Sequence, residues 1–241
     1  AVDCPASSYT LSSQAAVDAV PADCDRVADS LLVEGSDITN LDGLANITSV
    51  GGILQINSNA ALTNLDGLVN MTSVGGDLFI TRNPLLTNLN PLANITSVGG
   101  LYIQSNNALT NLNALANITS VGGNLLIAVN PALTNLDGLA NITSVGGDLR
   151  IQVNPALTNL NGLANITSVG GDLNIGENGA LTNLDGLANI TSVGDLFIGN
   201  NAALTNLNGL ANITSVARFL AINNNAALTN LDGLANITSV G

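Results

Sequence analysis

The feature that most constrains this chain is an internal repeat that fills it from residue 38 onward. Each unit opens with Ile or Leu, and the openings fall at residues 38, 62, 86, 109, 133, 157, 181, 204 and 228, so successive units are 23 or 24 residues long. A period of this length is typical of solenoids, in which a coil buries its apolar residues only by stacking on its neighbours. The repeat therefore predicts a rod of about nine coils over 38–241, preceded by a different segment at 1–37.

Inside each unit the apolar residues follow two spacings. In the unit that opens at Leu62, an apolar residue returns every third position as far as Val74, after which Leu78 and Ile80 alternate around an outward Phe79. A step of three matches neither an α-helix nor a plain strand, so we expect a turning, extended arc that points one residue in three inward. The alternation that follows predicts a short strand.

An asparagine follows each predicted strand. Its copies are Asn59, Asn83, Asn106, Asn130, Asn154, Asn178, Asn201 and Asn225. A repeated inward Asn is able to hydrogen-bond the backbone of the adjacent coil at a bend, as buried polar groups require. The alternative is an Asn that faces solvent in a turn.

The strand and its asparagine carry a family resemblance. LYIQSN at 101–106 and LFIGNN at 196–201 resemble the LxLxxN strand of leucine-rich repeats. Cys24, followed by an apolar strand and the VGGxLxI rhythm, is similar to the receptor L domain variant of that family. The resemblance spans roughly 24–241 and implies a right-handed solenoid whose strand face binds ligands. Because Gly, Asn and Thr disfavour helices in the arcs, we expect an all-β solenoid rather than an α/β horseshoe.

Residues 1–37 predict a small N-terminal cap. The stretch 12–20 favours a short helix, because a serine is able to cap it and Pro21 ends it. Cys4 and Cys24 predict one disulfide, worth about 3 kcal/mol through the loop that it closes; the alternative is two buried free thiols. A disulfide favours an oxidising compartment, so we expect a secreted or cell-surface protein from which any signal peptide has been removed.

Composition argues against several functions. The chain has four Arg, no Lys and no His against 17 acidic residues, for a net charge of −13. Nucleic acid is a poor partner because phosphates need cationic side chains, and no apolar run is long enough for membrane insertion. One column holds Asp42, Asp66, Asp137, Asp185 and Asp232 with Asn in the other units, which favours turn hydrogen bonding over catalysis. We expect a non-catalytic protein without a cofactor.

Two further motifs have a chemical interpretation that we rank second to a structural one. Asp77, Asp148, Asp172 and Asp195 follow glycines in a pattern similar to calcium-binding β-rolls, but the full GGxGxD motif is absent and Ca²⁺ needs several converging ligands. Every Asn-Ile-Thr or Asn-Met-Thr is a glycosylation sequon, from Asn46 to Asn236. Glycans stacked about 5 Å apart would collide, so we expect this Asn to shape the arc instead.

Two outer columns vary from unit to unit: the outward strand position and the position three residues further on. Together they hold three of the five aromatic residues and two of the four Arg, types that combine contact area with directed polar contacts in recognition surfaces. The predicted ligand-binding residues are Phe79, Arg82, Tyr102, Leu126, Val129, Arg150, Val153 and Phe197. The expected partner is an extracellular protein or a polysaccharide; the alternative is a surface that drifts without function.

Another outer column does not vary. It consists of Thr48, Thr72, Thr96, Thr119, Thr143, Thr167, Thr191, Thr214 and Thr238, beside a parallel column of Ser. Stacked identical side chains stabilise a coil as a ladder. Two alternatives stay open: this flat, uncharged lattice binds a repetitive surface such as ice, or copies of the protein assemble into an extracellular filament. The ninth unit stops before its strand, so we expect that the chain continues or that this uncapped coil stacks on another molecule.

Overall fold

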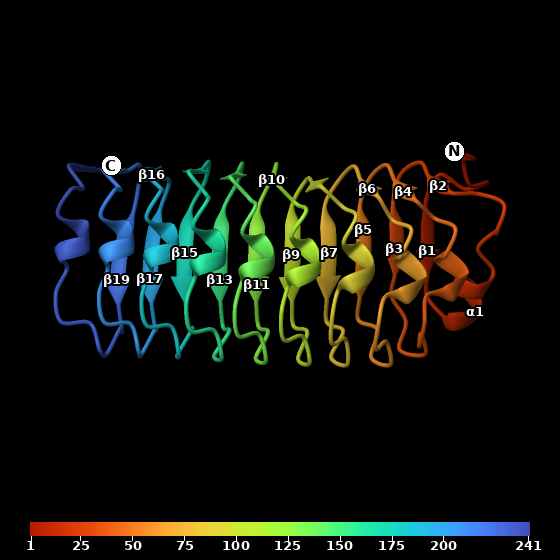
Figure 1. The fold of residues 1–241 in the computed structure, drawn as a ribbon, viewed down its shortest axis with the longest axis horizontal. Helices are drawn as coiled ribbons and strands as arrows, with labels where there is room; N and C mark the ends of the chain where they lie inside the picture. The colour runs from red at the N-terminus through yellow and green to blue at the C-terminus, as the bar shows by residue number, and fades with distance from the viewer.

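A computed structural model describes all of residues 1–241 and shows an elongated solenoid with the N-terminal segment at one end and the last coil at the other (Figure 1). A parallel sheet of ten strands runs along one face. In spatial order the strands are β1 (Tyr9–Leu11), β3 (Leu31–Val33), β5 (Leu54–Asn57), β7 (Leu78–Thr81), β9 (Leu101–Gln104), β11 (Leu125–Ala128), β13 (Leu149–Gln152), β15 (Leu173–Gly176), β17 (Leu196–Gly199) and β19 (Leu220–Asn223). This order follows the sequence, and the all-β solenoid predicted from the repeat is confirmed.

The sheet keeps one register from coil to coil. Leu78 pairs with Leu101 and Ile80 with Ile103, and the same pairing continues through the later coils. The inward Leu and Ile of β5 to β17 are fully buried. Because a slip of one residue would turn this apolar set to solvent, the buried pair fixes which residues of each strand face outward.

Two-residue strands form a second, narrower strip along the top of the rod in Figure 1. They are β2 (Arg26–Val27), β4 (Ser49–Val50), β6 (Ser73–Val74), β8 (Ser97–Val98), β10 (Ser120–Val121), β12 (Ser144–Val145), β14 (Ser168–Val169), β16 (Ser192–Val193), β18 (Ser215–Val216) and β20 (Ser239–Val240). Pairing in the strip breaks between β6 and β8 and between β14 and β16. β8 and β16 belong to the two 23-residue coils, so each break in the strip coincides with a shorter coil, while the large sheet stays continuous.

The arcs are partly helical, whereas an extended backbone was expected. Each contains one turn of 3₁₀ helix: η1 (Asp42–Leu44), η2 (Asp66–Leu68), η3 (Asn90–Leu92), η4 (Asn113–Leu115), η5 (Asp137–Leu139), η6 (Asn161–Leu163), η7 (Asp185–Leu187), η8 (Asn208–Leu210) and η9 (Asp232–Leu234). In η1 the N–H of Leu44 donates to the carbonyl of Leu41 at 2.8 Å. Because a 3₁₀ helix has three residues per turn, it continues the step of three that the apolar residues follow.

One hydrophobic core runs through the whole rod. In each inner arc three apolar positions, such as Leu133, Leu136 and Leu139, are fully buried. Burial of each such side chain stabilises the fold by roughly 1.5–3 kcal/mol. The coils also approach closely: a Cβ on Gly162 would lie 1.9 Å from the carbonyl oxygen of Leu136 in the preceding coil, so the glycine of η6 allows consecutive 3₁₀ turns to stack.

The asparagine after each strand points inward and bonds the neighbouring coils, as predicted. Seven of these residues are fully buried: Asn59, Asn83, Asn106, Asn130, Asn154, Asn178 and Asn201. The Oδ1 of Asn130 accepts a hydrogen bond from the N–H of Asn106 at 3.1 Å. Its Nδ2 donates to the carbonyls of Ile103 and Ala128, each at 3.0 Å. One buried amide thus pairs backbone groups that the corner would otherwise leave without partners.

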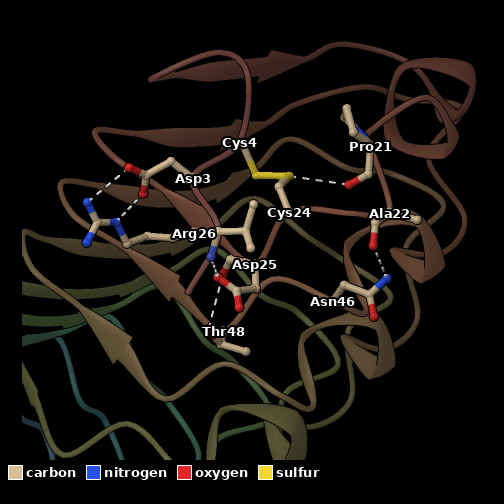
Figure 2. The surroundings of a disulfide bond; sticks show 10 residues. Asp3, Cys4, Pro21, Ala22, Cys24, Asp25, Arg26, Asn46 and Thr48 are labelled. Carbon is tan, nitrogen blue, oxygen red and sulfur yellow. Dashed lines mark hydrogen bonds and ion pairs between the residues drawn. A yellow bond between two sulfur atoms is a disulfide. The ribbon is translucent and has the colours of Figure 1, made fainter.

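The disulfide predicted for the N-terminal segment is confirmed. Cys4 and Cys24 are bonded to each other, next to an ion pair in which Arg26 lies 2.6 Å from Asp3 (Figure 2). The Oγ1 of Thr48 in the first repeat donates to the carbonyl of Asp25 at 3.1 Å. These contacts join the disulfide loop to the start of the array. Because β1 and β3 belong to the long sheet, the domain boundary at residue 37 stays a prediction.

The predicted short helix is also confirmed, as α1 (Gln14–Asp18). The Oγ of Ser13 caps it by accepting a hydrogen bond from the N–H of Ala16 at 3.2 Å. The helix lies beside η1, and the Oε1 of Gln14 accepts hydrogen bonds from the backbone N–H groups of Thr39 and Asn40. α1 therefore covers the open side of the first arc. No helix in the structure combines the length and apolar character that crossing a membrane requires.

Replacing Asn130 with Ala tests the buried ladder. We expect the free energy of unfolding to fall by roughly 3–5 kcal/mol, because several buried donors and acceptors lose their partner at about 1–3 kcal/mol each. The matched variant is Asn141→Ala, which loses an exposed hydrogen bond of 2.7 Å to the carbonyl of Ala116 and should cost only about 1 kcal/mol. Urea unfolding followed by circular dichroism measures both, and equal losses would contradict a special role for the buried column.

Candidate functional site

The outward side of the long sheet carries the first variable column. From β5 to β19 its residues are Gln55, Phe79, Tyr102, Leu126, Arg150, Asn174, Phe197 and Ala221. Successive members are cross-strand partners, so their side chains stand next to one another, about 4.8 Å apart along the rod. From β5 to β17, buried residues on both sides of each position hold it in place, which makes this part of the face a rigid platform.

A hollow of ≈ 300 Å³, which we call the strand-face hollow, opens on this platform over β9, β11 and β13. Tyr102, Leu126 and Arg150 line it from the outward column. Val129 and Val153, which follow the ends of β11 and β13, line it as well. The structure therefore brings together five of the residues that the sequence predicts for the ligand site.

Polar groups complete the lining of the strand-face hollow. Arg150 pairs with Asp148 at 2.8 Å, and both residues line the hollow together with Gln104, Gln152 and Asn124. The two glutamines are not among the predicted site residues. Their column, the last residue of each strand, also varies, but it has five residue types at eight positions whereas the outward column has seven: Asn57, Thr81, Gln104, Ala128, Gln152, Gly176, Gly199 and Asn223. That weaker variation marks the column as variable but does not single out the two glutamines.

The other three predicted residues lie outside the strand-face hollow. Phe79 stacks on Tyr102, with ring centroids 4.3 Å apart and an angle of 9° between the planes, so it extends the platform by one coil. Arg82 lines a second hollow with Ser58 and Ser105. Phe197 stands on β17, separated from Arg150 by the β15 strand. The structure thus places Phe79 and Arg82 beside the hollow and Phe197 away from it.

The second variable column has an unusual backbone. Its residues are Ser58, Arg82, Ser105, Val129, Val153, Glu177, Asn200 and Asn224, and all of them have φ between 52° and 58°. The backbone turns sharply here, between the end of the strand and the buried asparagine. In this left-handed region Asn is enriched several-fold over most residues, whereas a β-branched side chain is an outlier. The two valines of the hollow are therefore the least suited of the eight to their backbone.

The threonine ladder is largely exposed, and six of its nine hydroxyls donate a hydrogen bond to the preceding turn of the chain: those of Thr48, Thr72, Thr143, Thr167, Thr214 and Thr238. Thr72, for example, donates from Oγ1 to the carbonyl of Thr48 at 3.0 Å, and Thr238 donates to Thr214 at 3.1 Å. The N–H of Thr72 donates to the same carbonyl at 2.8 Å. A stabilising role therefore accounts for most of this column without a ligand. The nine threonines predicted as an alternative ligand-binding face follow one another from coil to coil.

The sequon asparagines also bond the preceding coil. The Nδ2 of Asn165, at which a glycan would be attached, donates to the carbonyl of Ala140 at 2.7 Å, and the other sequon asparagines make the equivalent bond. This contact gives the Asn of the repeated ANITSV motif a structural role. It agrees with the expectation that this residue shapes the arc.

The strand-entry carboxylates are engaged in the same kind of bond. The Oδ1 of Asp148 accepts from the N–H of Asp172, and the Oδ1 of Asp172 accepts from the N–H of Asp195, each at 2.8 Å. Arg218 pairs with both Asp172 and Asp195; its hydrogen bond to Asp195, followed by the charge of Asp172, raises the pKa of Arg218 above its ordinary value. No three acidic or sulfur ligands converge on a point where they could hold a metal ion.

Comparison with known proteins agrees with this geometry. The model of the receptor L domain family matches residues 23–114. Among solved structures, the chain is similar to an internalin of Listeria monocytogenes, with a TM-score of 0.56 and 20% identity. The similarity covers 89% of this chain and 59% of the internalin chain. A search of curated proteins finds no match. The chain is thus a leucine-rich-repeat-like solenoid.

Proposed function

We propose that this protein is a non-catalytic, extracellular interaction or adhesion protein, and that it binds a protein or carbohydrate ligand at the strand-face hollow. The observation that carries the proposal is the pair Val129 and Val153. Both have a left-handed backbone, with φ of 57° and 55°, and both line the hollow. A β-branched residue in this conformation is an outlier that costs about 1–3 kcal/mol.

The backbone conformation does not explain why valine occupies these two positions. Four of the other coils place Ser or Asn at the same position: Ser58, Ser105, Asn200 and Asn224. Val129 is 36% exposed and Val153 is half-buried, so part of each apolar side chain stays open to the hollow. Contact with a ligand accounts for a residue that is strained, apolar and only partly buried, because such strain persists mainly where function requires it.

The chemistry of the hollow suits recognition. Tyr102 and Arg150 combine contact area with directed polar groups, and residues of these types contribute most of the binding energy in many interfaces. The stacked pair of Phe79 and Tyr102 is rigid, so little side-chain entropy is lost when a ligand binds. The similarity to receptor L domains supports the same role, and the disulfide supports an extracellular location.

A second candidate function is ice binding through the threonine ladder. The observation that favours it is the regular repeat of exposed threonines such as Thr72, Thr143 and Thr167. Each of these three is held in place by a hydrogen bond to the preceding coil. Assembly into a filament, including self-association through the C-terminal coil, stays a prediction. The strand-face proposal ranks first because the ladder has a structural explanation and the two valines have none.

Replacing Val129 with Asn tests whether the valine costs stability at this left-handed position, as expected of a residue retained for ligand binding. We expect the free energy of unfolding to rise by about 1 kcal/mol, because Asn adopts the left-handed region more readily. The matched variant is Asn200→Val at the same position of another coil, which should lose at least about 1 kcal/mol. Urea unfolding compares the three proteins. A clear loss of stability in the Val129 variant would show that the valine is held by packing and would remove the basis of the proposal.

Replacing Phe79, Tyr102 and Arg150 together with Ala tests the site itself. A ligand found by screening the intact protein against extracellular proteins and glycans should bind this variant at least about 30-fold more weakly, since a central aromatic or Arg contributes about 2 kcal/mol or more. The control replaces Thr110, Thr134 and Thr158 with Ala on the arcs. Biolayer interferometry measures both, and binding that survives the first triple change places the ligand elsewhere.

Thermal hysteresis tests the second candidate. If the ladder binds ice, the intact protein lowers the freezing point without an equal change of the melting point. The double variant Thr119→Tyr, Thr143→Tyr should abolish this effect, because the large rings disrupt the flat lattice. The triple alanine variant of the strand face should keep the activity. Absence of both hysteresis and recrystallisation inhibition in the intact protein would exclude this function.

A further inference from the structure

A second hollow, of ≈ 370 Å³, lies next to the strand-face hollow at the ends of β5, β7 and β9. It is built from equivalent positions of three consecutive coils. Its lining consists of Ser58, Ala60, Arg82, Pro84, Ser105 and Asn107. Between the two lining residues of each coil lies one asparagine of the buried ladder, so the corner that forms the hollow is fixed by the interior.

Arg82 differs from every other cationic residue of the chain. Arg26 pairs with Asp3, Arg150 with Asp148, and Arg218 with Asp172 and Asp195. Arg82 has no carboxylate partner, although the chain has 17 acidic residues, and no acidic residue lines its hollow. It also has a left-handed backbone, with φ of 54°. An unpaired charge is thus held at a strained position between two small residues.

The neighbours of Arg82 are hydrogen-bond donors without partners. The hydroxyls of Ser58 and Ser105 flank it on either side along the column, and Asn107 adds a side-chain amide. None of these three side chains makes a hydrogen bond within the protein. A guanidinium between two hydroxyls is suited to an oxyanion, because its planar fork donates two parallel bonds to a carboxylate or sulfate while the hydroxyls supply further donors.

We propose that the Arg82 hollow is an oxyanion subsite that receives a single carboxylate or sulfate group. This inference deepens the proposed function: the ligand would place its apolar part over Leu126, Val129 and Val153 and its anionic group at Arg82, which directly follows β7, the strand that carries Phe79. A single anionic group is favoured over a polyanion, because the net charge of −13 repels a chain of negative charges.

The experiment follows the Nε–H signals of the four Arg by ¹⁵N NMR during titration with sodium acetate or sodium sulfate, with chloride holding the ionic strength constant. We expect a saturable shift of the Arg82 signal alone, in the acetate arm for a carboxylate site and in the sulfate arm for a sulfate site. Arg82→Gln should weaken the binding at least about tenfold, as followed by the backbone amides of Ser58 and Ser105. The matched variant Arg218→Gln should leave it unchanged.

Two outcomes would overturn the proposal: no saturable shift with either anion, or equal shifts of all four Arg signals, as a diffuse ion atmosphere would give. Neither anion requires the macromolecular ligand to be known. If neither anion binds at Arg82, the proposal for the strand-face hollow therefore still stands. If instead the triple variant of Phe79, Tyr102 and Arg150 keeps its affinity for the macromolecular ligand, the oxyanion subsite still stands, but it does not belong to the site of that ligand.

Discussion

Each coil of this solenoid depends on one buried amide at the corner where its strand ends. Asn130 accepts a hydrogen bond from one coil and donates to carbonyls of its own and the preceding coil, and its equivalents repeat the arrangement along the rod. A corner without this amide would bury unpaired backbone groups at a cost of about 1–3 kcal/mol each. Because the amide must point inward directly after the strand, the residue before it turns into the left-handed region. The interior thus fixes the backbone on which Val129 and Arg82 stand.

The faithful copying of polar surface residues follows from the same stacking. The Nδ2 of Asn165 donates to the preceding coil, as does the hydroxyl of Thr167, and both belong to the ANITSV motif. In a solenoid every coil meets a copy of itself, so a side chain that bonds the next coil is useful in all of them. Residues of the outward strand column make almost no such bonds. Variation, and with it the capacity to recognise a ligand, is concentrated in columns whose side chains make few bonds between coils.

Most of the fold could be predicted from the sequence because the same pattern of apolar and polar residues occurs in nine successive units. The strand, the inward asparagine and the Cys4–Cys24 disulfide each have a local signal: alternation, an invariant polar residue and a pair of cysteines. The 3₁₀ turn was missed because a step of three fits an extended arc as well as a helix of three residues per turn. Gln104 and Gln152 were missed because membership of the hollow depends on how three strands align, which the spacing within a single unit does not specify.

Residues in the variable columns can be compared directly with one another, because the repeat places them in equivalent positions. Eight coils place a residue in the same left-handed backbone, so the geometry is constant and only the side chain changes. Where Asn occupies the position, the residue suits the backbone. Val129, Val153, Arg82 and Glu177 suit it less well, and the first three of these line a hollow whereas Glu177 does not. Drift without function would place unsuitable residues anywhere along the column. The presence of three of these four residues at the two hollows next to the stacked Phe79 and Tyr102 agrees with a ligand-binding site on this part of the rod.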